Sequence, residues 1–243
     1  MPPALVLLHG FTQTRQSWRR TVQALEGRYR AVAPDLPGHG QASERPASFA
    51  AATAYIRALN PAILAGYSMG GRIALHAAFS LKPSRLILVG ASPGLQDPQE
   101  RARRKRDDDA LADRIEQIGI EAFATEWGSQ ALFEGQAERV RAAAYADRLR
   151  NTPHGLAAAL RGLGTGAMQP LWERLPQLGT PVTLIVGERD AKFRAIAERM
   201  RERLPNAELT IVPGAGHAAQ LERPELVAAA IYQSGSPSSS ASA

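Results

Sequence analysis

Short apolar runs alternate with amphipathic segments through the first ninety residues of the chain. Four runs have the length and largely apolar character of buried strands: residues 5–8, 30–33, 62–65 and 86–90. Three segments carry apolar side chains at intervals of three and four residues, which is typical of helices: 17–25, 49–59 and 72–78. This alternation predicts an α/β fold with a mostly parallel central sheet and helices on both of its faces.

The pattern changes after residue 97 and returns after residue 178. The intervening stretch has four helical segments and no convincing strand: 101–118, 119–127, 136–151 and 154–163. Strands at 182–186 and 209–212 and helices at 193–204 and 224–232 then complete the alternation. We therefore expect an α/β core (1–97 and 179–233), a helical cap (98–178) over the carboxyl ends of the strands, and a serine-rich disordered tail (234–243).

Residues 66–70 place a serine in a glycine-flanked turn between a predicted strand and a predicted helix. The sequence Gly66-Tyr67-Ser68-Met69-Gly70 is a G-x-S-x-G motif. In this context the turn lifts the Ser68 hydroxyl out of the sheet at a helix N-terminus, where free N–H groups favour negative charge. The alternative is a glycine-rich turn with an incidental serine, which the motif alone does not exclude.

Base or nucleophilic chemistry at Ser68 requires a histidine to take its proton and a carboxylate to orient that histidine. Of the five histidines, His217 stands in a glycine-rich loop after the last predicted strand, whereas His76 is over two helical turns from Ser68. Asp190 follows the strand before the last. Ser68, Asp190 and His217 thus follow three predicted strands in a known order of catalytic triads, which favours a catalytic interpretation over three unrelated turn residues.

Two backbone N–H groups are candidates for an oxyanion hole. That of Met69 follows the serine, and that of Phe11 follows the first predicted strand, beside Gly10, which permits close approach. The alternative for residues 9–11 is a simple turn that ends the strand.

Composition narrows the class of protein further. No apolar run approaches the ~20 residues needed to span a bilayer, no basic region precedes the first apolar run, and there are no cysteines. We expect a cytoplasmic protein without a membrane segment, a metal site or a cofactor. The net charge is +6, but the densest basic cluster, residues 101–106, has no interleaved aromatics and is followed by three aspartates, which argues against nucleic-acid binding.

Arg72 is the most informative single residue of the predicted elbow helix. It lies four residues after Ser68, so it is the next-turn neighbour on the same helix face. A guanidinium there suits a carboxylate through bidentate pairing and is unnecessary for ordinary ester hydrolysis. The alternative is an arginine that turns sideways into a surface salt bridge.

Several motifs together resemble the α/β-hydrolase superfamily and, within it, the 2-succinyl-6-hydroxy-2,4-cyclohexadiene-1-carboxylate synthases of menaquinone biosynthesis. The general motifs are residues 8–11, 34–40, 66–72 and 187–190. The specific ones are Tyr67, Arg72, Trp127, the segment 92–106 with its arginines, and residues 149–151, 187–195 and 213–217. The resemblance extends over nearly the whole chain, to about residue 232.

The resemblance implies a lyase, with no cofactor, that acts on 2-succinyl-5-enolpyruvyl-6-hydroxy-3-cyclohexene-1-carboxylate. Such an enzyme removes a proton next to the succinyl ketone and eliminates pyruvate. Ser68 would be the base, supported by His217 and Asp190, and the N–H groups of Phe11 and Met69 would hold the enolate oxygen. Five residues match substrate-binding positions of these lyases: Arg72, Arg104, Arg150, Tyr67 and Trp127.

Three questions stay open at this point. Arg101 or Arg103 can replace Arg104, because a shift of one residue turns a helical side chain by ~100°. The end product can be menaquinone or phylloquinone, and the oligomeric state is not indicated. The competing functions are a serine hydrolase acting on esters or carbon–carbon bonds, and a non-catalytic binding protein, which the intact Ser68, Asp190 and His217 disfavour.

Overall fold

One sheet of six parallel strands forms the centre of the molecule. The computed structural model describes residues 1–233; the expected disordered tail, 234–243, lies outside the described residues. The strand order is β2-β1-β3-β4-β5-β6. The bounds are β1 (Ala4–Leu8), β2 (Arg30–Val32), β3 (Ile63–Tyr67), β4 (Arg85–Val89), β5 (Val182–Gly187) and β6 (Ala207–Val212). The four inner strands are buried along their whole length, which explains why they are largely apolar.

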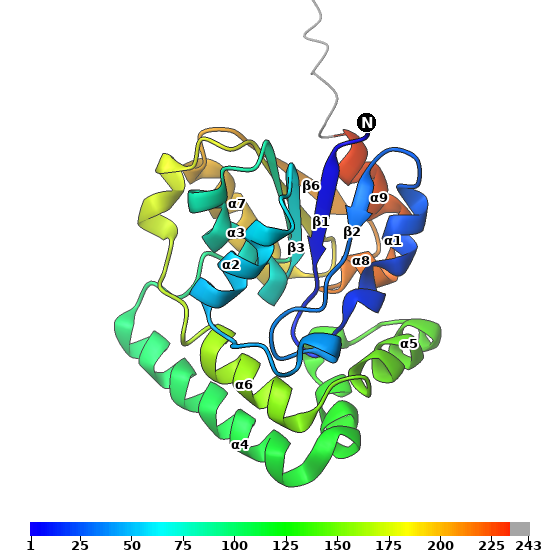
Figure 1. Cartoon of the computed structure of the whole chain (residues 1–243), viewed down its shortest axis with the longest axis vertical. Coiled ribbons are helices and arrows are strands. Elements are labelled where there is room, and N and C mark those ends of the chain that lie inside the picture. The colour runs from blue at the N-terminus through cyan, green and yellow to red at the C-terminus, as the bar shows by residue number, and fades with distance from the viewer. Residues whose placement is uncertain (234–243) are drawn as a thin grey trace, which may run out of the picture.

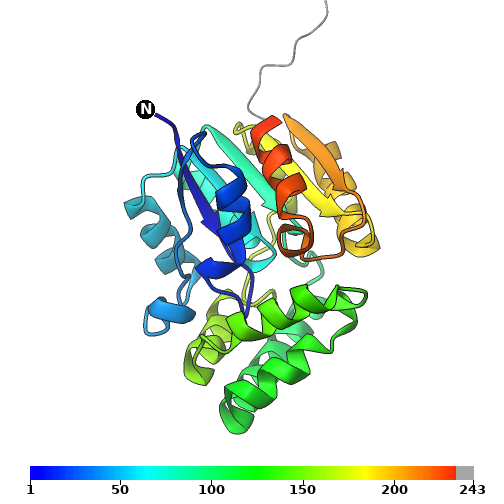
Figure 2. The ribbon, with the colours of Figure 1, turned by 90° about the vertical axis from the view of Figure 1, so that its right-hand side faces the viewer.

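Helices cover both faces of the sheet, as predicted. Along β1, Leu5 and Leu7 face one apolar layer while Val6 and Leu8 face the other. On the first face lie α1 (Arg19–Ala24) and α9 (Pro224–Gln233), and on the second lie α2 (Phe49–Ala58), α3 (Met69–Leu81) and α7 (Ala191–Arg203). Figure 2 shows the red α9 and the blue α1 side by side on one side of the strands.

A separate group of helices lies at the carboxyl ends of the strands. These are α4 (Pro98–Gly128), α5 (Glu138–Arg148) and α6 (Pro153–Leu163), drawn in green below the sheet in Figure 1. Their own apolar cluster contains Ile115, Phe123 and Leu156. Gly119, with φ 77° and ψ 174°, breaks α4 into two helical parts, where the sequence predicts one helix ending and another beginning.

The remaining elements are short helical turns that periodicity does not reveal. They are η1 (Arg15–Trp18), η2 (Gly40–Ala42), η3 (Ala131–Phe133), η4 (Trp172–Gln177) and α8 (Ala219–Glu222). The helix predicted at 17–25 is therefore η1 followed by α1, and the one predicted at 136–151 is shorter at both ends. None of the helices described between residues 1 and 233 is both long and apolar enough to cross a membrane.

Candidate active site

Ser68 occupies a sharp turn between β3 and α3. Its backbone has φ 50° and ψ −110°, a region that residues with a side chain rarely adopt. The two motif glycines make this turn possible. A Cβ atom on Gly66 would overlap the backbone of Gly70, and one on Gly70 would overlap the carbonyl oxygens of Leu8 and His9. The turn leaves Ser68 partly exposed at the N-terminus of α3.

Ser68, His217 and Asp190 form a hydrogen-bonded chain above the sheet. His217 Nε2 lies 3.2 Å from Ser68 Oγ, and His217 Nδ1 lies 2.7 Å from Asp190 Oδ2. His217 and Asp190 are 3% and 7% exposed, so water is almost absent from their contact. The three residues follow β3, β6 and β5, whose carboxyl ends meet at one edge of the sheet.

The imidazole of His217 is fixed by packing as well as by Asp190. The Phe193 ring lies 4.4 Å and the Tyr67 ring 5.2 Å from it, between centroids. A Cβ on Gly90, which has φ 54°, would stand only 3.1 Å from the imidazole. The Asp190 carboxylate is held too, because its Oδ1 accepts a hydrogen bond from the backbone N–H of Phe193 at the start of α7.

A buried carboxylate that sequence analysis missed connects both partners of Ser68. Glu222, on α8, accepts hydrogen bonds from the backbone N–H of Gly216 (2.9 Å) and from Arg189 Nη2 (2.7 Å). These residues directly precede His217 and Asp190. Its second oxygen accepts from Gln136, in the segment between η3 and α5, at 3.2 Å. Glu222 thus holds the histidine loop, the aspartate loop and the helical segment above them together.

The two candidate oxyanion-hole donors stand at the ends of neighbouring strands, since β1 and β3 pair with Leu8 opposite Gly66. Within residues 1–233, neither the Phe11 N–H nor the Met69 N–H donates a hydrogen bond to another protein group. The loop that carries Phe11 is shaped by Thr12, with φ 67°, and by Gly10, where a side chain would overlap the Tyr67 ring. Both groups are therefore available to a developing negative charge.

Two further histidines shape this loop in their neutral form. The backbone N–H of Leu36 donates to His9 Nε2 at 2.9 Å, so His9 carries its proton on Nδ1, which donates to the Gly10 carbonyl. Burial lowers the pKa of His9 to about 4 and that of its neighbour His39 to about 3. Their buried rings contact each other edge-on, with centroids 5.0 Å apart.

Arg72 is buried, which excludes the surface salt bridge that the sequence left open as an alternative, while its role in binding a carboxylate stays a prediction. It is 9% exposed, and its Nη1 donates to the backbone carbonyl of Leu163, the last residue of α6, at 2.9 Å. The reason is that α6 ends directly above this turn of α3 and presents unpaired carbonyls there. Burial, and secondarily the charge of Arg104, lowers the pKa of Arg72 to about 10.

The other two predicted arginines are bound to acidic neighbours on their own helical segments. Arg104 Nε lies 2.8 Å from Asp108 Oδ1, and Arg150 Nε lies 3.8 Å from Asp147 Oδ1. Their side chains are 44% and 59% exposed. Among the contacts of residues 1–233, neither guanidinium hydrogen-bonds to Ser68, and their role in binding remains a prediction.

The two predicted aromatic residues lie nearer the reactive groups. Tyr67 is buried against His217, and burial followed by the charges of Asp190 and Glu222 raises the pKa of its hydroxyl. The Trp127 ring lies 5.1 Å from that of Phe11, between centroids. Its Nε1–H is buried without a partner among the described residues, so it is a free donor beside the loop that carries Phe11.

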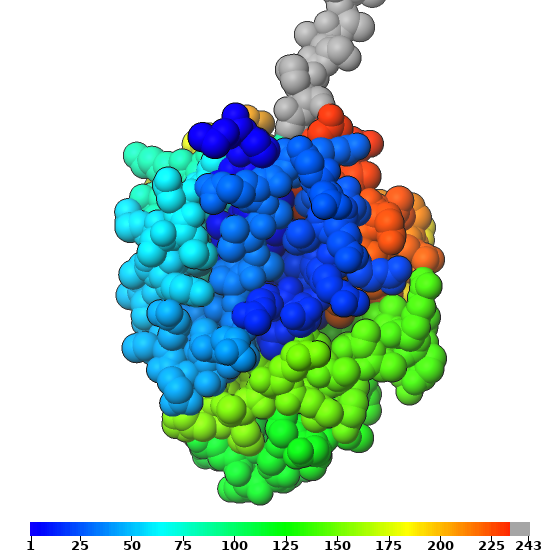
Figure 3. Space-filling model, turned by 45° about the vertical axis from the view of Figure 1, so that its right-hand side comes forward, coloured from blue at the N-terminus to red at the C-terminus, as the bar shows by residue number. Residues whose placement is uncertain are grey.

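The helical segment 98–178 is hydrogen-bonded directly to loops of the N-terminal part of the chain, and Figure 3 shows the green atoms of this segment packed against the blue atoms of that part. Asp147 of α5 accepts hydrogen bonds from the Thr14 backbone (2.9 Å) and from the Thr14 hydroxyl. Asn151 donates to the Thr12 carbonyl at 2.9 Å and accepts from the Gly40 N–H at 3.0 Å. The arrangement leaves the Ser68 hydroxyl, the His217 imidazole and the N–H groups of Phe11 and Met69 under the helices α4, α5 and α6. Within residues 1–233, no cluster of three or more acidic or histidine side chains could hold a metal ion.

Comparison with known proteins agrees with this geometry. A model described as the alpha/beta hydrolase family matches residues 5–230, and the chain belongs to this family. Within it, the chain is 39% identical over 238 residues to the putative 2-succinyl-6-hydroxy-2,4-cyclohexadiene-1-carboxylate synthase of Bacillus subtilis (strain 168), covering 92% of this chain and 86% of that protein. It is 34% identical over 240 residues to the synthase of Klebsiella pneumoniae, covering 95% and 93%.

The solved structures include a similar relative. The structure of MenH from S. aureus superposes with a TM-score of 0.90 at 32% sequence identity, covering 96% of this chain and 92% of that one. The likeness therefore includes the helical segment between β4 and β5 as well as the sheet.

Proposed function

We propose that this chain is a 2-succinyl-6-hydroxy-2,4-cyclohexadiene-1-carboxylate synthase. It would take 2-succinyl-5-enolpyruvyl-6-hydroxy-3-cyclohexene-1-carboxylate, a small tricarboxylate, and eliminate pyruvate from it in the cytoplasm, as a step of menaquinone or phylloquinone synthesis. One observation carries the proposal: Ser68, His217 and Asp190 are hydrogen-bonded to one another in a polypeptide that is similar, over most of its length, to proteins named for this reaction.

In the proposed mechanism Ser68 is a base rather than a nucleophile. Its hydroxyl oxygen accepts the proton next to the succinyl ketone while its own proton passes to His217 Nε2, 3.2 Å away. Asp190 accepts from Nδ1–H, keeps the imidazole in the required tautomer and stabilises its positive charge. The electron pair moves into the ketone and forms an enolate, whose oxygen the N–H groups of Phe11 and Met69 hold.

The second half of the reaction breaks the carbon–oxygen bond to the enolpyruvyl group. As the enolate re-forms the ketone, its electrons create a ring double bond between carbons 2 and 3, the existing 3,4 double bond moves to carbons 4 and 5, and the enolate of pyruvate leaves carbon 5. The proton held by His217 then returns to the site and neutralises the leaving group, which becomes pyruvate. Protons and electrons balance without a cofactor.

The three carboxylates of this substrate require cationic partners. We assign Arg72, Arg104 and Arg150 to them, and Tyr67 and Trp127 to the walls of the pocket. The Nη1 contact to Leu163 uses one donor of Arg72 and leaves others on the same guanidinium. Residues 98–178 would act as the cap that brings Arg104 and Arg150 over the core formed by 1–97 and 179–233.

The same geometry supports a second candidate, a serine hydrolase in which Ser68 forms an acyl-enzyme. The 3.2 Å contact between Ser68 and His217 is equally suited to nucleophilic attack. The two functions differ in what they release, and one experiment separates them.

The purified protein is incubated with the enolpyruvyl substrate, and pyruvate and diene absorbance are followed together. A generic aryl ester serves as the comparison substrate, and the Ser68→Ala variant as the control. We expect pyruvate and diene in equal amounts, at a rate that Ser68→Ala lowers at least a thousandfold. Rapid ester cleavage without pyruvate release would replace the lyase with the hydrolase.

A further inference from the structure

Two buried glutamines connect the loop that carries Phe11 with the short helix that follows His217. Gln220, on α8, donates a hydrogen bond from its Nε2 to Oε1 of Gln13 at 3.3 Å, although 207 residues separate the two along the chain. The same oxygen accepts a hydrogen bond from the backbone N–H of Gly10 at 3.2 Å. Both glutamines are buried, so these bonds are shielded from water. The proposed mechanism uses neither side chain.

The backbone N–H of Gly10 determines how both side-chain amides are oriented. It can donate only to an oxygen, so Oε1 of Gln13 faces it, and the group that Gln220 presents to that oxygen must be its NH2. Oε1 of Gln220 consequently points elsewhere, and it is buried without a hydrogen-bond partner among residues 1–233. A buried amide oxygen without a partner lowers stability. The arrangement therefore favours a role in the site over a role in the stability of the fold.

Residues 10–13 form a turn whose conformation needs support. The backbone N–H of Gln13 donates to the Gly10 carbonyl at 3.2 Å, and Thr12 has φ 67°. A positive φ at the third position of the turn is the pattern of a type II turn, which favours glycine or asparagine there. Threonine is branched at Cβ, so this conformation is unfavourable for it. A strained turn of this kind persists only where the surrounding contacts hold it.

Gln13 holds both of the peptide groups that flank Gly10. Its side-chain oxygen fixes the peptide group before Gly10, and its backbone N–H fixes the one after it, through the Gly10 carbonyl. In a trans peptide the N–H points away from the carbonyl, so the fixed Gly10 carbonyl also fixes the direction of the Phe11 N–H. Glycine alone would leave this direction free, and a Cβ at position 10 would overlap the Tyr67 ring. The contacts of Gln13 therefore supply the restriction that the glycine lacks.

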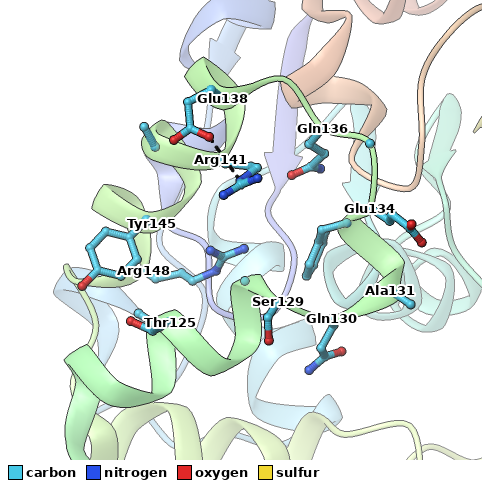
Figure 4. A pocket seen from close by; sticks show the side chains of 15 residues that line it. Thr125, Ser129, Gln130, Ala131, Glu134, Gln136, Glu138, Arg141, Tyr145 and Arg148 are labelled. Carbon is cyan, nitrogen blue, oxygen red and sulfur yellow. Dashed lines mark ion pairs between the residues drawn. The ribbon is translucent and has the colours of Figure 1, made fainter.

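The helix α8 connects this turn with the proton acceptor of the site. It places Gln220 three residues after His217, and it is also held by the helical segment 98–178, because Glu222 accepts a hydrogen bond from Gln136. Gln136 lines a cavity of about 890 Å³ between the end of α4, η3 and α5, as Figure 4 shows. The imidazole that takes the proton and the N–H that faces the developing charge are thus connected through one short helix.

We propose that Gln13 and Gln220 are positioning residues of the oxyanion hole, which fix the Phe11 N–H relative to His217. The inference rests on the proposed function, in which this N–H holds the enolate oxygen. That oxygen becomes charged only as the proton is removed, whereas the ketone of the bound substrate is neutral. A correctly directed N–H therefore stabilises the transition state more than the bound substrate. Loss of this direction should lower kcat and leave KM nearly unchanged.

The first test compares Gln220→Leu with Gln23→Leu in the full chain. Leucine keeps most of the side-chain volume and removes the amide, and Gln23 is exposed on α1. We expect Gln220→Leu to lower kcat for pyruvate release about tenfold, which is part of the roughly 100- to 1000-fold loss that follows removal of a whole donor. KM should change less than about twofold, and Gln23→Leu should change neither constant.

The melting temperature separates this effect from a structural role. It should stay equal or rise in Gln220→Leu, because the variant removes a buried oxygen that has no partner among residues 1–233. A residue that only stabilises the fold would lower the melting temperature and leave kcat per folded molecule unchanged. That result overturns the proposal.

The second test asks whether the two glutamines act as one unit. We expect Gln13→Leu to lower kcat at least as much as Gln220→Leu, because Gln220 acts on the turn only through Gln13. The double variant should then be no slower than Gln13→Leu alone. Effects that multiply in the double variant overturn the proposed coupling.

The third test needs no turnover. The protein is labelled with ¹⁵N at its six phenylalanines, and the Phe11 N–H signal is identified by its loss in Phe11→Leu. We expect Gln220→Leu to shift this signal and to leave that of Phe79, on α3, in place. A static Phe11 signal overturns the proposal.

The same variants distinguish failure of this inference from failure of the proposed function. Ester cleavage without pyruvate release, slowed about tenfold in Gln220→Leu, would reject the proposed function and keep the positioning role. Pyruvate release together with a static Phe11 signal and an unchanged kcat would do the reverse.

Discussion

Nη1 of Arg72 donates a hydrogen bond of 2.9 Å to the carbonyl oxygen of Leu163. One residue lies on the helix that begins at the serine turn, and the other ends α6 in the helical layer above. The contact therefore connects α3, which begins at the serine turn, with α6 of the helical segment above it. It also explains why a charged residue is tolerated in a position that is 9% exposed.

Replacing Arg72 with methionine should separate function from stability. The lowered pKa, about 10, corresponds to about 3 kcal/mol of unfavourable burial of the charge. Loss of a hydrogen bond from a charged donor costs about 1.5–3 kcal/mol, so the two effects nearly cancel. We expect the free energy of unfolding in urea to change by less than about 1 kcal/mol, while kcat/KM for pyruvate release falls at least a hundredfold. Large destabilisation with retained activity would make Arg72 a structural residue only.

Glu222 should act as a positioning residue for His217. Glu222→Gln removes the charge that receives Arg189 Nη2 and the Gly216 N–H. We expect kcat to fall about tenfold with KM little changed. The free energy of unfolding should fall by about 2 kcal/mol, less than for a fully buried ion pair, because the Arg189 side chain is 41% exposed. Glu225→Gln is the matched control, since Glu225 is 69% exposed and 3.9 Å from Arg20. Equal kinetics of the two variants would contradict the positioning role.

The serine turn should tolerate no side chain at Gly70. A Cβ there would overlap the carbonyl oxygens of Leu8 and His9, both of them backbone atoms that cannot move aside. We expect Gly70→Ala to destabilise the protein by about 3 kcal/mol or more, measured by thermal unfolding, and to abolish turnover. Gly179→Ala serves as the control because nothing lies within 4 Å of its Cβ position. Similar melting temperatures for the two variants would show that the turn relaxes freely.

Stability should fall steeply in mild acid because of His9 and His39. Both have lowered pKa values in the folded state, about 4 and about 3, against an ordinary 6.5. The unfolded chain therefore binds more protons below pH 6.5, so their contribution is complete above that pH and is lost as pH falls toward 4 and 3. Each histidine contributes a slope of about 1.4 kcal/mol per pH unit in that window.

Urea unfolding between pH 7 and pH 4 measures this slope. The variant His39→Leu removes one of the two titrating groups and should reduce the slope by about half. A pH-independent free energy of unfolding would mean that the His9–Leu36 hydrogen bond survives protonation, which the geometry of Nε2 does not allow.

The sheet and the serine site were predictable because their signals are local. The inner strands are largely apolar runs, since both faces are buried, and Ser68 and Asp190 stand in the turns that follow two of them, while His217 stands in the loop after the edge strand β6. Parallel strands bring their carboxyl ends together whatever the details of packing, so the three residues had to meet at one edge.

The contacts of the helical layer were not predictable in the same way. The inward direction of Arg148 and the outward direction of Arg150 depend on how α5 ends and packs, and sequence spacing does not reveal that. Glu222 was missed because α8 spans only four residues and has no periodicity. The carbonyl partner of Arg72 on α6 was not predictable either, because it depends on how two segments distant in sequence dock.

The backbone conformation of Ser68 lowers the stability of the fold while it presents the hydroxyl needed for turnover. A non-glycine residue held at φ 50° and ψ −110° costs about 1–3 kcal/mol, whereas glycine adopts such angles freely and loses about 0.5–1 kcal/mol through its greater freedom in the unfolded chain. Selection for heat resistance alone would therefore favour glycine at position 68 and erase the reactive hydroxyl. Directed evolution of this protein for thermal stability must therefore screen for turnover in every round, because replacing Ser68 with glycine would stabilise the fold and remove the reactive hydroxyl.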